Sequence, residues 1–524
     1  MFILLIIIAV IAVAYYLIKS LTYWKNKGIP QGPIWYWIKD DINTLYRNYS
    51  FSERLIEIYN MIPGTRYCGV YQFTKPFLLI KDVELLKEIT VKNFDHFTDH
   101  SNVIPEGVEP LWVRNLFVLK GQKWRYMRPI LSPSFTSSKM RTIFELISEC
   151  TENFIGHFQE KNDDIIEVEL KETFTRFTTD VIATTAFGLK TNSLKDPTND
   201  FFVMGQMLSK FASGFRNLWK FMVLALSPTL FKILNLSIFD KKVMSFFTDI
   251  IDQTIKVRKE QGIIRPDMIH LLIEAQKSIA KEEQVEDLSF AAHTESDLGQ
   301  QNVAEKKELT NMDIAAQALI FFFAGFDSVA IAMSFMGYEL AVNEEVQDRL
   351  RKEIKDTLEK CNGKLTYEAL NKMKYFDMVV SESLRKWPSA SISDRECTKA
   401  FTIEPKLPSE KPLHLKEKSI LWVPIAAIHR NPNYYPDPEK FDPERFNDEN
   451  KHNIDPNAYL PFGLGPRNCI GSRFALMEIK TIYFYLLQHF ELIPVKRSQI
   501  PVQLSLASFQ LNAKDGFWFG FKRI

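Results

Sequence analysis

The stretch PFGLGPRNCIG, from Pro461 to Gly471, places a single cysteine, Cys469, among glycines, an arginine and a phenylalanine. The stretch raises the question of what a single cysteine does among such residues, because the same loop can be a structural turn and nothing more. The other cysteines are scattered singly, which argues against a zinc cluster or a disulfide framework and is typical of a reduced, cytosol-facing chain. They are Cys68, Cys150, Cys361 and Cys397. The role of Cys469 has to be decided from the rest of the chain.

The size and charge of the chain narrow its class. With 524 residues, of which 46% are hydrophobic and 25% charged, it can bury one very large core or several ordinary ones. The formal net charge of +1 gives no electrostatic reason to expect a nucleic-acid partner.

The N-terminus is apolar enough to cross a membrane. From Met1 to Ile18 the chain carries no charge, which is about the lower length limit for spanning a hydrocarbon core. A cleaved signal peptide is the alternative, because Ala12–Ala14 weakly resembles a cleavage site, but no basic segment precedes the apolar run. We favour a retained anchor over residues 1–20, followed by a breaker-rich linker over 21–36. By the positive-inside rule, the downstream chain faces the cytosol because lysines follow the run at 19, 25 and 27.

Beyond the linker, residues 37–524 are predicted to form one mainly α domain with a small β part. Helical periodicity is found over 137–160, 166–187, 240–260, 310–343, 344–360, 376–386 and 471–490. Short β-like pieces occur near 67–82, 400–405, 412–423 and 514–522. A polar stretch from about 278 to 310 predicts a surface loop.

The segment between Phe201 and Phe239 is dense in large apolar residues. It can form two core helices, or an exposed apolar flank that dips into the bilayer beside the anchor and admits lipophilic substrates. Periodicity does not choose between these interpretations.

The run TNMDIAAQALIFFFAGFDSVAIAMSFMGYEL, at 310–340, predicts a long buried helix that begins with a capping box of Thr310 and Asp313. Within it, Gly325 costs about 1 kcal/mol relative to alanine, and Asp327 and Ser328 place polar groups among phenylalanines. One interpretation is a helix kink with the serine bonded back to its own turn. The other is a local opening where a small ligand and water receive protons from the acid and the alcohol.

A second short pattern, SESLRKWP at 381–388, puts Glu382 and Arg385 three residues apart on one helical face, where they can pair. A surface ion pair is the default interpretation of so short a pattern. The proline-rich stretch at 429–446 offers Arg445 as a third member and leads towards the cysteine loop.

Taken in chain order, these patterns resemble the cytochromes P-450, the haem-thiolate monooxygenases, over essentially the whole length. The pattern F-x-x-G-x-R-x-C-x-G is met by Phe462, Gly465, Arg467, Cys469 and Gly471. The run FGLGPRNCIGSRFALMEIK is similar to the clan of vertebrate drug-metabolising and insect detoxifying enzymes. The runs DHFTDH, RNLFVLKGQKWRYMRPILSPSFT and AQALIFFFAGFDS are most similar to the ninth insect family. The resemblance implies the cytochrome P-450 fold, preceded here by a single N-terminal transmembrane helix.

The resemblance also implies haem b, iron protoporphyrin IX, with Cys469 as its axial thiolate. The helix after Cys469 is expected to help keep the sulfur deprotonated, and Gly465 and Gly471 to allow tight turns and close approach to the porphyrin. Phe462 would shield the sulfur from water. The residues expected to hold the propionates are Arg467, Trp124, Arg128 and Arg395. Glu382, Arg385 and Arg445 would form a buried triad with a folding role.

By the same resemblance, Ala324 to Ser328 would lie over the distal face of the haem, with Asp327 bringing in protons and Ser328 steering them. The sequence departs from the usual pattern here, because serine replaces threonine and Val329 follows where a second hydroxyl is frequent. Serine keeps the donor but lacks the methyl that restricts its rotamer, so we expect looser coupling of oxygen use to product.

Electrons have to come from outside, because the sequence holds no flavin or nicotinamide fingerprint. The resemblance implies the membrane-bound NADPH-cytochrome P-450 reductase, so NADPH acts only indirectly, and cytochrome b5 is a further candidate donor. By analogy the reductase docks on the cysteine side, on a basic surface made of Lys120, Lys123, Arg125, Arg473 and Lys480. The catalytic domain would face the cytosol from the endoplasmic reticulum membrane, with O2 and lipophilic small molecules as substrates.

The substrate is the least determined part of the prediction. The positions that match the pocket of the clan are Phe117, Phe323, Ala324, Ser389, Ala390 and Phe509. The resemblance suggests xenobiotics such as plant toxins and insecticides, and the alternative is an endogenous lipid, hormone or hydrocarbon. Two other classes stay open, a haem-thiolate isomerase that needs no reductase and a haem-binding protein without turnover.

Overall fold

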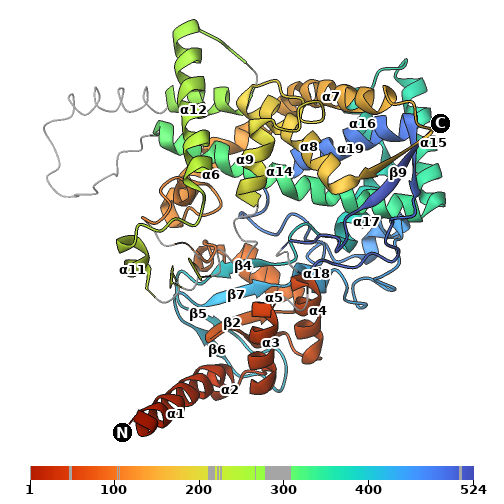
Figure 1. Cartoon of the computed structure of the whole chain (residues 1–524). Coiled ribbons are helices and arrows are strands. Elements are labelled where there is room, and N and C mark those ends of the chain that lie inside the picture. Colours follow the sequence, from red (N-terminus) through yellow and green to blue (C-terminus); the bar gives the residue numbers. More distant parts are fainter. Residues whose placement is uncertain are drawn as a thin grey trace, which may run out of the picture.

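The computed structural model describes residues 2–46, 50–102, 104, 107–209, 219–220, 223–224, 227–265, 267–277, 309–506 and 510–524, and helices dominate them (Figure 1). In the first half of the chain the helices are α1 Phe2–Leu21, α2 Tyr23–Asn26, α3 Ile34–Tyr46, α4 Phe51–Met61, α5 Val83–Lys87, α6 Gly121–Leu131, α7 Ser137–Gln159, α8 Leu170–Ile182, α9 Asp200–Ser209, α11 Pro228–Ile233 and α12 Lys241–Gln261. They continue with α14 Asn311–Val342, α15 Glu344–Lys360, α16 Tyr367–Lys372, α17 Lys374–Lys386, α18 Ile425–Ile428 and α19 Ser472–His489.

The long helix α14 runs through the middle of the helical part of the molecule (Figure 1). The predicted capping box at its start is confirmed, because the Asp313 N–H donates to Thr310 Oγ1 at 3.2 Å and the Thr310 N–H donates to Asp313 Oδ2 at 2.9 Å. Among the helices whose side chains are all described, which excludes α1, α14 is the one found to be long and apolar enough to cross a membrane, and 67% of its most apolar window is buried. Its apolar side chains therefore belong to the core.

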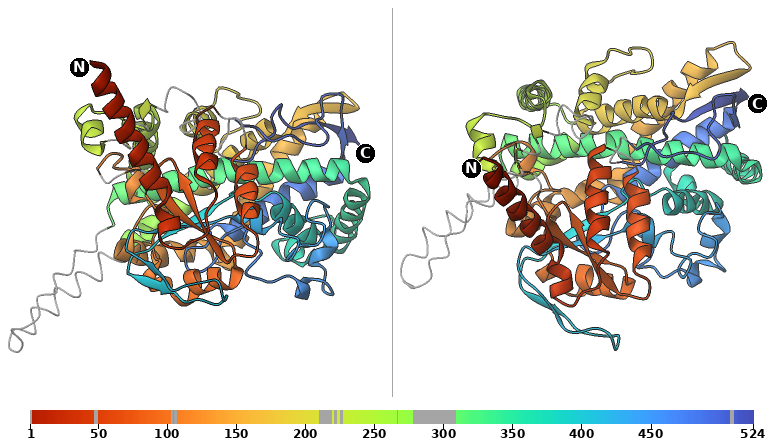
Figure 2. Two further views of the ribbon diagram at one scale, coloured as in Figure 1. Left: turned by 90° about the horizontal axis from the view of Figure 1, so that it is seen from below. Right: turned by 60° about the horizontal axis from the view of Figure 1, so that its bottom comes forward.

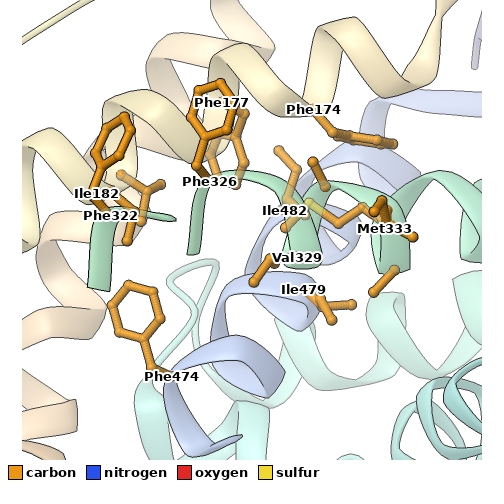
Figure 3. Packing of buried hydrophobic residues seen from close by; sticks show 14 of the residues in the cluster. Phe174, Phe177, Ile182, Phe322, Phe326, Val329, Met333, Phe474, Ile479 and Ile482 are labelled. Atoms are coloured by element: carbon orange, nitrogen blue, oxygen red, sulfur yellow. The ribbon is translucent and has the colours of Figure 1, made fainter. Parts of the chain in front are cut away.

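Helix α14 lies between α8 and α19. Figure 3 shows Phe177 and Ile182 of α8 on one side of α14, and Phe474 and Ile479 of α19 on the other. Gly325 allows this close packing, because a Cβ at that position would lie 2.5 Å from the Ile182 side chain. The glycine thus has a packing reason that the sequence pattern did not reveal.

The β part consists of three small sheets. The first has the order β1-β2-β7-β4, built from Tyr67–Gln72, Lys75–Ile80, Ile420–Val423 and Ser393–Glu396, and β2 pairs with β7 in parallel. The second has the order β3-β9-β8, from Ile165–Glu169, Trp518–Arg523 and Phe490–Pro494, and the third pairs β5 Phe401–Ile403 with β6 Leu413–Leu415. The helix predicted over 166–187 was wrong at its start, because strand β3 occupies 165–169 and pairs with the distant β9.

A second hydrophobic cluster forms beneath the first sheet and includes residues of α2, α3 and α4, such as Trp24, Trp37 and Leu55. Helix α1 extends from this part, and its N-terminal end points away from the body (Figure 2). Large apolar side chains in its first half are exposed, with Phe2 at 76% and Ile3 at 73%, whereas Leu21 at its end is buried.

In the apolar segment 201–239, some of the described residues are buried, as expected for core helices, and others are exposed, as expected for an apolar flank. Phe201 and Phe202 of α9 are buried in the core, whereas Ile233 and Leu234, at the end of α11, are 74% and 53% exposed. The surface loop predicted over 278–310 lies outside the described residues except for its last two positions.

Candidate active site

Cys469 lies at the end of a loop that main-chain hydrogen bonds fold back on itself. The Cys469 N–H donates to the Phe462 carbonyl at 2.8 Å, and the Asn468 N–H donates to the Gly465 carbonyl at 3.0 Å. Gly465 has a left-handed φ of 77°, and a Cβ there would lie 2.1 Å from the Thr90 carbonyl oxygen. The close approach at Gly465 is therefore to the protein's own backbone, and it sets the path of the loop.

The surroundings of the Cys469 sulfur act on its ionisation in opposite directions. Cys469 is the one exposed cysteine of the five, yet protein atoms crowd around it closely enough for desolvation to raise the pKa of its thiol. The Gly471 N–H, at the start of α19, and the Arg128 guanidinium lower that pKa. Desolvation is the larger influence, so the pKa of the thiol stays raised.

Three arginines from different segments gather beside this loop. Arg128 of α6 donates to the Asn468 side chain at 2.9 Å, and Arg395 of β4 donates to the Leu464 carbonyl at 3.1 Å. Burial, Arg395 and Arg128 outweigh the effect of Asp99 and lower the pKa of Arg467 to about 9. The Nε of Arg395 is buried without a hydrogen-bond partner. A cation cluster with an unsatisfied buried donor fits a dianionic ligand, such as the two propionates of a haem.

Arg467 itself differs from the prediction. Its Nε donates to the Thr98 carbonyl at 2.7 Å, Nη1 to Leu116 at 3.3 Å, and Nη2 to Leu119 at 2.6 Å. A further contact to Asp99 at 3.4 Å leaves one of the five guanidinium N–H groups for a propionate. The guanidinium also lies 4.2 Å above the ring of Trp124. Arg467 therefore braces the segment from 98 to 119 against the cysteine loop.

The sequence motifs did not single out His100, which lies beside the same cluster. Its Nδ1 bonds Asp394 Oδ1 at 2.8 Å, and its ring stacks on that of Phe117 with centroids 4.8 Å apart. Burial lowers the pKa of His100, and the opposing effect of its hydrogen bond to Asp394 is smaller. Its position at the end of DHFTDH was the one signal available in the sequence.

The acid and the alcohol of α14 both have partners in the structure. Ser328 Oγ donates to the Ala324 carbonyl at 2.5 Å, which is the back-bonded arrangement that the sequence allowed. Asp327 forms an ion pair with Lys171 of α8, and the two side chains are 14% and 15% exposed. Ala324 is exposed, whereas Phe322 and Phe326, two residues before and after it in α14, are buried. No sequence signal pointed to Lys171, because it lies 156 positions before its partner.

The predicted pocket positions come from four segments that the structure partly connects. Ser389, after α17, donates its hydroxyl to the Ser328 carbonyl at 2.8 Å and so ties its loop to α14. Phe323 of α14 lies against Trp112 with ring centroids 5.5 Å apart. Phe117 is 53% exposed and Ala390 is exposed as well. Phe509 lies outside the described residues.

Glu382, Arg385 and Arg445 come together as a buried network. Arg385 Nε and Nη2 donate to the two Glu382 oxygens at 2.7 and 2.8 Å, and neither side chain is exposed. Arg445 Nε lies 3.4 Å from Glu382 Oε1, and the Asp442 N–H donates to the same oxygen at 2.9 Å. The surface ion pair considered from the sequence is therefore wrong for this pattern.

The basic surface expected around Cys469 needs one correction. Lys480 is 3% exposed, forms an ion pair with Asp377 and donates to the Leu370 carbonyl at 3.3 Å, so it is a core residue. Lys120 is paired with Glu396 at 2.7 Å and Arg125 with Asp95. Lys123 and Arg473 are exposed.

Known proteins are similar in sequence to this chain over nearly its whole length. A family model described as Cytochrome P450 matches residues 65–518. Cytochrome P450 9e2 of Blattella germanica is 45% identical over 494 residues, which cover 91% of this chain and 89% of that protein. Probable cytochrome P450 9f2 of Drosophila melanogaster is 39% identical over 507 residues, covering 95% and 94%. Cytochrome P450 6k1 of Blattella germanica is 36% identical over 515 residues, covering 98% and 95%.

Proposed function

We propose that this protein, which belongs to the cytochrome P450 family and is a haem-thiolate monooxygenase, oxygenates lipophilic xenobiotics with Cys469 as the axial ligand. Within the family it is most like the ninth insect family. One observation carries the assignment of Cys469. Of the five cysteines it alone is exposed, and it lies three residues before α19, beside a cluster of arginines that suits the propionates. The other four are buried or partly buried.

Each residue of the proposed haem site would have its own role. When bound, haem with an anionic axial sulfur supplies the activation of dioxygen. Arg128, Arg395 and Trp124 would orient the group through its propionates, and Arg467 would add one donor while bracing the loop around it. Asp327 would hold a proton at its carboxylate and pass it towards Ser328, which requires Lys171 to release the acid for part of the cycle. Phe323 and Phe117 would offer an apolar surface to the substrate.

Electron supply is proposed from the membrane-bound NADPH-dependent reductase that serves the family. Lys123 and Arg473 are exposed cations near the cysteine side, so they are the candidates for contact with an acidic partner. Lys480 no longer belongs to this surface.

Turnover tests the proposal. Purified full-length chain is combined with a P450 reductase, NADPH and a lipophilic alkoxycoumarin, whose O-dealkylation releases a fluorescent phenol. We expect product that depends on NADPH, reductase and O2 together. Product formed from an organic hydroperoxide alone, with none from the complete system across a panel of xenobiotics and fatty acids, would instead favour a reductase-independent enzyme.

A further inference from the structure

A histidine outside the signature motifs connects the Glu382–Arg385 network to the cysteine loop. His429 follows α18 and is completely buried. Its Nδ1 lies 2.9 Å from the Arg385 carbonyl oxygen, and the Leu460 N–H donates to its Nε2 at 2.8 Å. Because Nε2 accepts a hydrogen bond, the ring proton is on Nδ1 and is donated to Arg385. The imidazole thus has both nitrogens bonded to main chain of two different segments.

The first of these bonds closes the end of α17. Arg385 is in the last turn of that helix, where carbonyl groups have no partner within the helix. The Arg385 side chain returns the contact, because its Nη1 donates to the His429 carbonyl at 3.0 Å. His429 and Arg385 are therefore fixed to each other by reciprocal bonds, on the same arginine that pairs with Glu382.

The second bond fixes the start of the cysteine loop. Leu460 is buried, and its carbonyl accepts from the Gly463 N–H at 3.0 Å to begin the turn that ends at Cys469. The preceding residue is also tied to α17, since the Tyr459 hydroxyl donates to the Ser381 carbonyl at 3.2 Å. The rings of His429 and Tyr459 stack with centroids 5.9 Å apart.

We propose that His429 is a positioning residue for the axial ligand. By joining the Arg385 carbonyl to the Leu460 amide, it fixes the position of the 460–469 loop relative to the end of α17, and so keeps the Cys469 sulfur bonded as a thiolate. This inference rests on the proposed role of Cys469. A neutral ring is required, because a protonated imidazole has no acceptor for Leu460. Burial, with the charge of Arg385 adding to it, lowers the pKa of His429 to about 3, so the neutral form persists at physiological pH.

The test compares His429→Phe, which removes both hydrogen bonds, with the parent protein and with His452→Phe, which removes an exposed histidine of the same region. Each full-length holoprotein is reduced, exposed to carbon monoxide and scored for the share of its haem that gives the red-shifted thiolate band, with total haem measured independently. We expect the His429→Phe protein to lose much of that share and to release haem to apomyoglobin about tenfold faster, as is usual when a support behind a metal ligand is removed. His452→Phe should match the parent.

Local hydrogen exchange separates positioning from general stability. In the His429→Phe protein, exchange should rise in peptides covering 456–469 and not across the molecule. His429→Gln, which can still reach the Leu460 amide with an acceptor, should restore most of the thiolate share, whereas the shorter His429→Asn should not. If His429→Phe yields no holoprotein, the Gln and Asn proteins carry the comparison.

Two results would overturn the inference: an unchanged thiolate share in His429→Phe, or equal shares in the Gln and Asn proteins. Absence of the thiolate band from the parent would count against the role of Cys469 itself, so the two failures are distinguishable.

Discussion

At the scale of single residues, the structure changes how the acid and the alcohol of α14 are understood. Asp327 is held by Lys171, and Ser328 is bonded to the Ala324 carbonyl, so both polar groups are satisfied in this state. Proton delivery by Asp327 therefore requires the ion pair to open. A largely buried pair of this kind is stronger than an exposed one, and its opening can limit the rate.

We predict that Ser328→Thr tightens the coupling of oxygen use to product. Threonine keeps the hydroxyl, and its added methyl restricts the rotamers between the back-bonded position and the pocket. Hydrogen peroxide released per product, measured in the reconstituted system, should fall in Ser328→Thr and rise in Ser328→Ala. A threonine variant that releases as much peroxide as the parent would contradict the expectation of loose coupling.

Whether a contact between two residues could be predicted from local patterns depends on how far apart the two residues are in the sequence. Residues within one motif were placed correctly together, as Glu382 and Arg385 show. The pairs Lys171–Asp327 and His100–Asp394 were not predicted, because nothing local to Lys171 or His100 points to its distant partner. Lys480 was misassigned for the same reason, since its burial against Asp377 comes from tertiary packing.

At the scale of elements, periodicity predicted the long helices well and the short strands less well. The predicted helices over 240–260, 310–343 and 471–490 agree with α12, α14 and α19 to within one or two residues at each end. Strands β3, β4 and β8 were missed, because each is defined by pairing with distant segments rather than by a local pattern.

Glycine at position 325 gives a prediction about the packing of these helices. Gly325→Ala gains about 1 kcal/mol in helix propensity but places a Cβ 2.5 Å from the Ile182 side chain, an overpacking that costs about 1–3 kcal/mol, so we expect a net destabilisation of up to about 2 kcal/mol. The matched control is Gly156→Ala on α7, where no atom lies within 4 Å of the added Cβ, and it should stabilise by up to about 1 kcal/mol. Denaturant midpoints followed by circular dichroism measure both, and equal shifts of the same sign would refute the packing role.

At the scale of the whole molecule, a helical core around α14 and a smaller sheet-rich part meet where the arginine cluster and the cysteine loop lie. Arg128 comes from the helical part and Arg395 from the first sheet, and both reach the same loop. The sequence predicted this convergence through the family resemblance alone, because no local pattern sets the distance between α6 and β4.

We propose that α1 anchors this body to the endoplasmic reticulum with the catalytic domain in the cytosol. Its exposed apolar side chains, such as Phe2 and Ile3, have no protein surface to cover them, and transfer into lipid is favourable by roughly 25 cal/mol per Å2. The full-length chain should stay in the membrane pellet after alkaline carbonate extraction, and a chain lacking residues 2–21 should be released. Equal retention of the two would contradict the anchor. Asn235 begins the glycosylation sequon Asn-Leu-Ser, so a glycan on it, detected by endoglycosidase digestion, would contradict the cytosolic orientation.

The most direct test of the whole interpretation is the absorbance difference spectrum of the dithionite-reduced, carbon monoxide-treated protein beside its Cys469→Ala variant. Thiolate-ligated ferrous haem gives a strongly red-shifted Soret band. We predict that band in the parent and its loss in the variant, with Cys361→Ala, at a partly buried cysteine elsewhere in the fold, behaving as the parent. Well-folded, haem-loaded parent protein without the band, or a Cys469→Ala variant that keeps it, would show that the Cys469 sulfur is not the thiolate ligand.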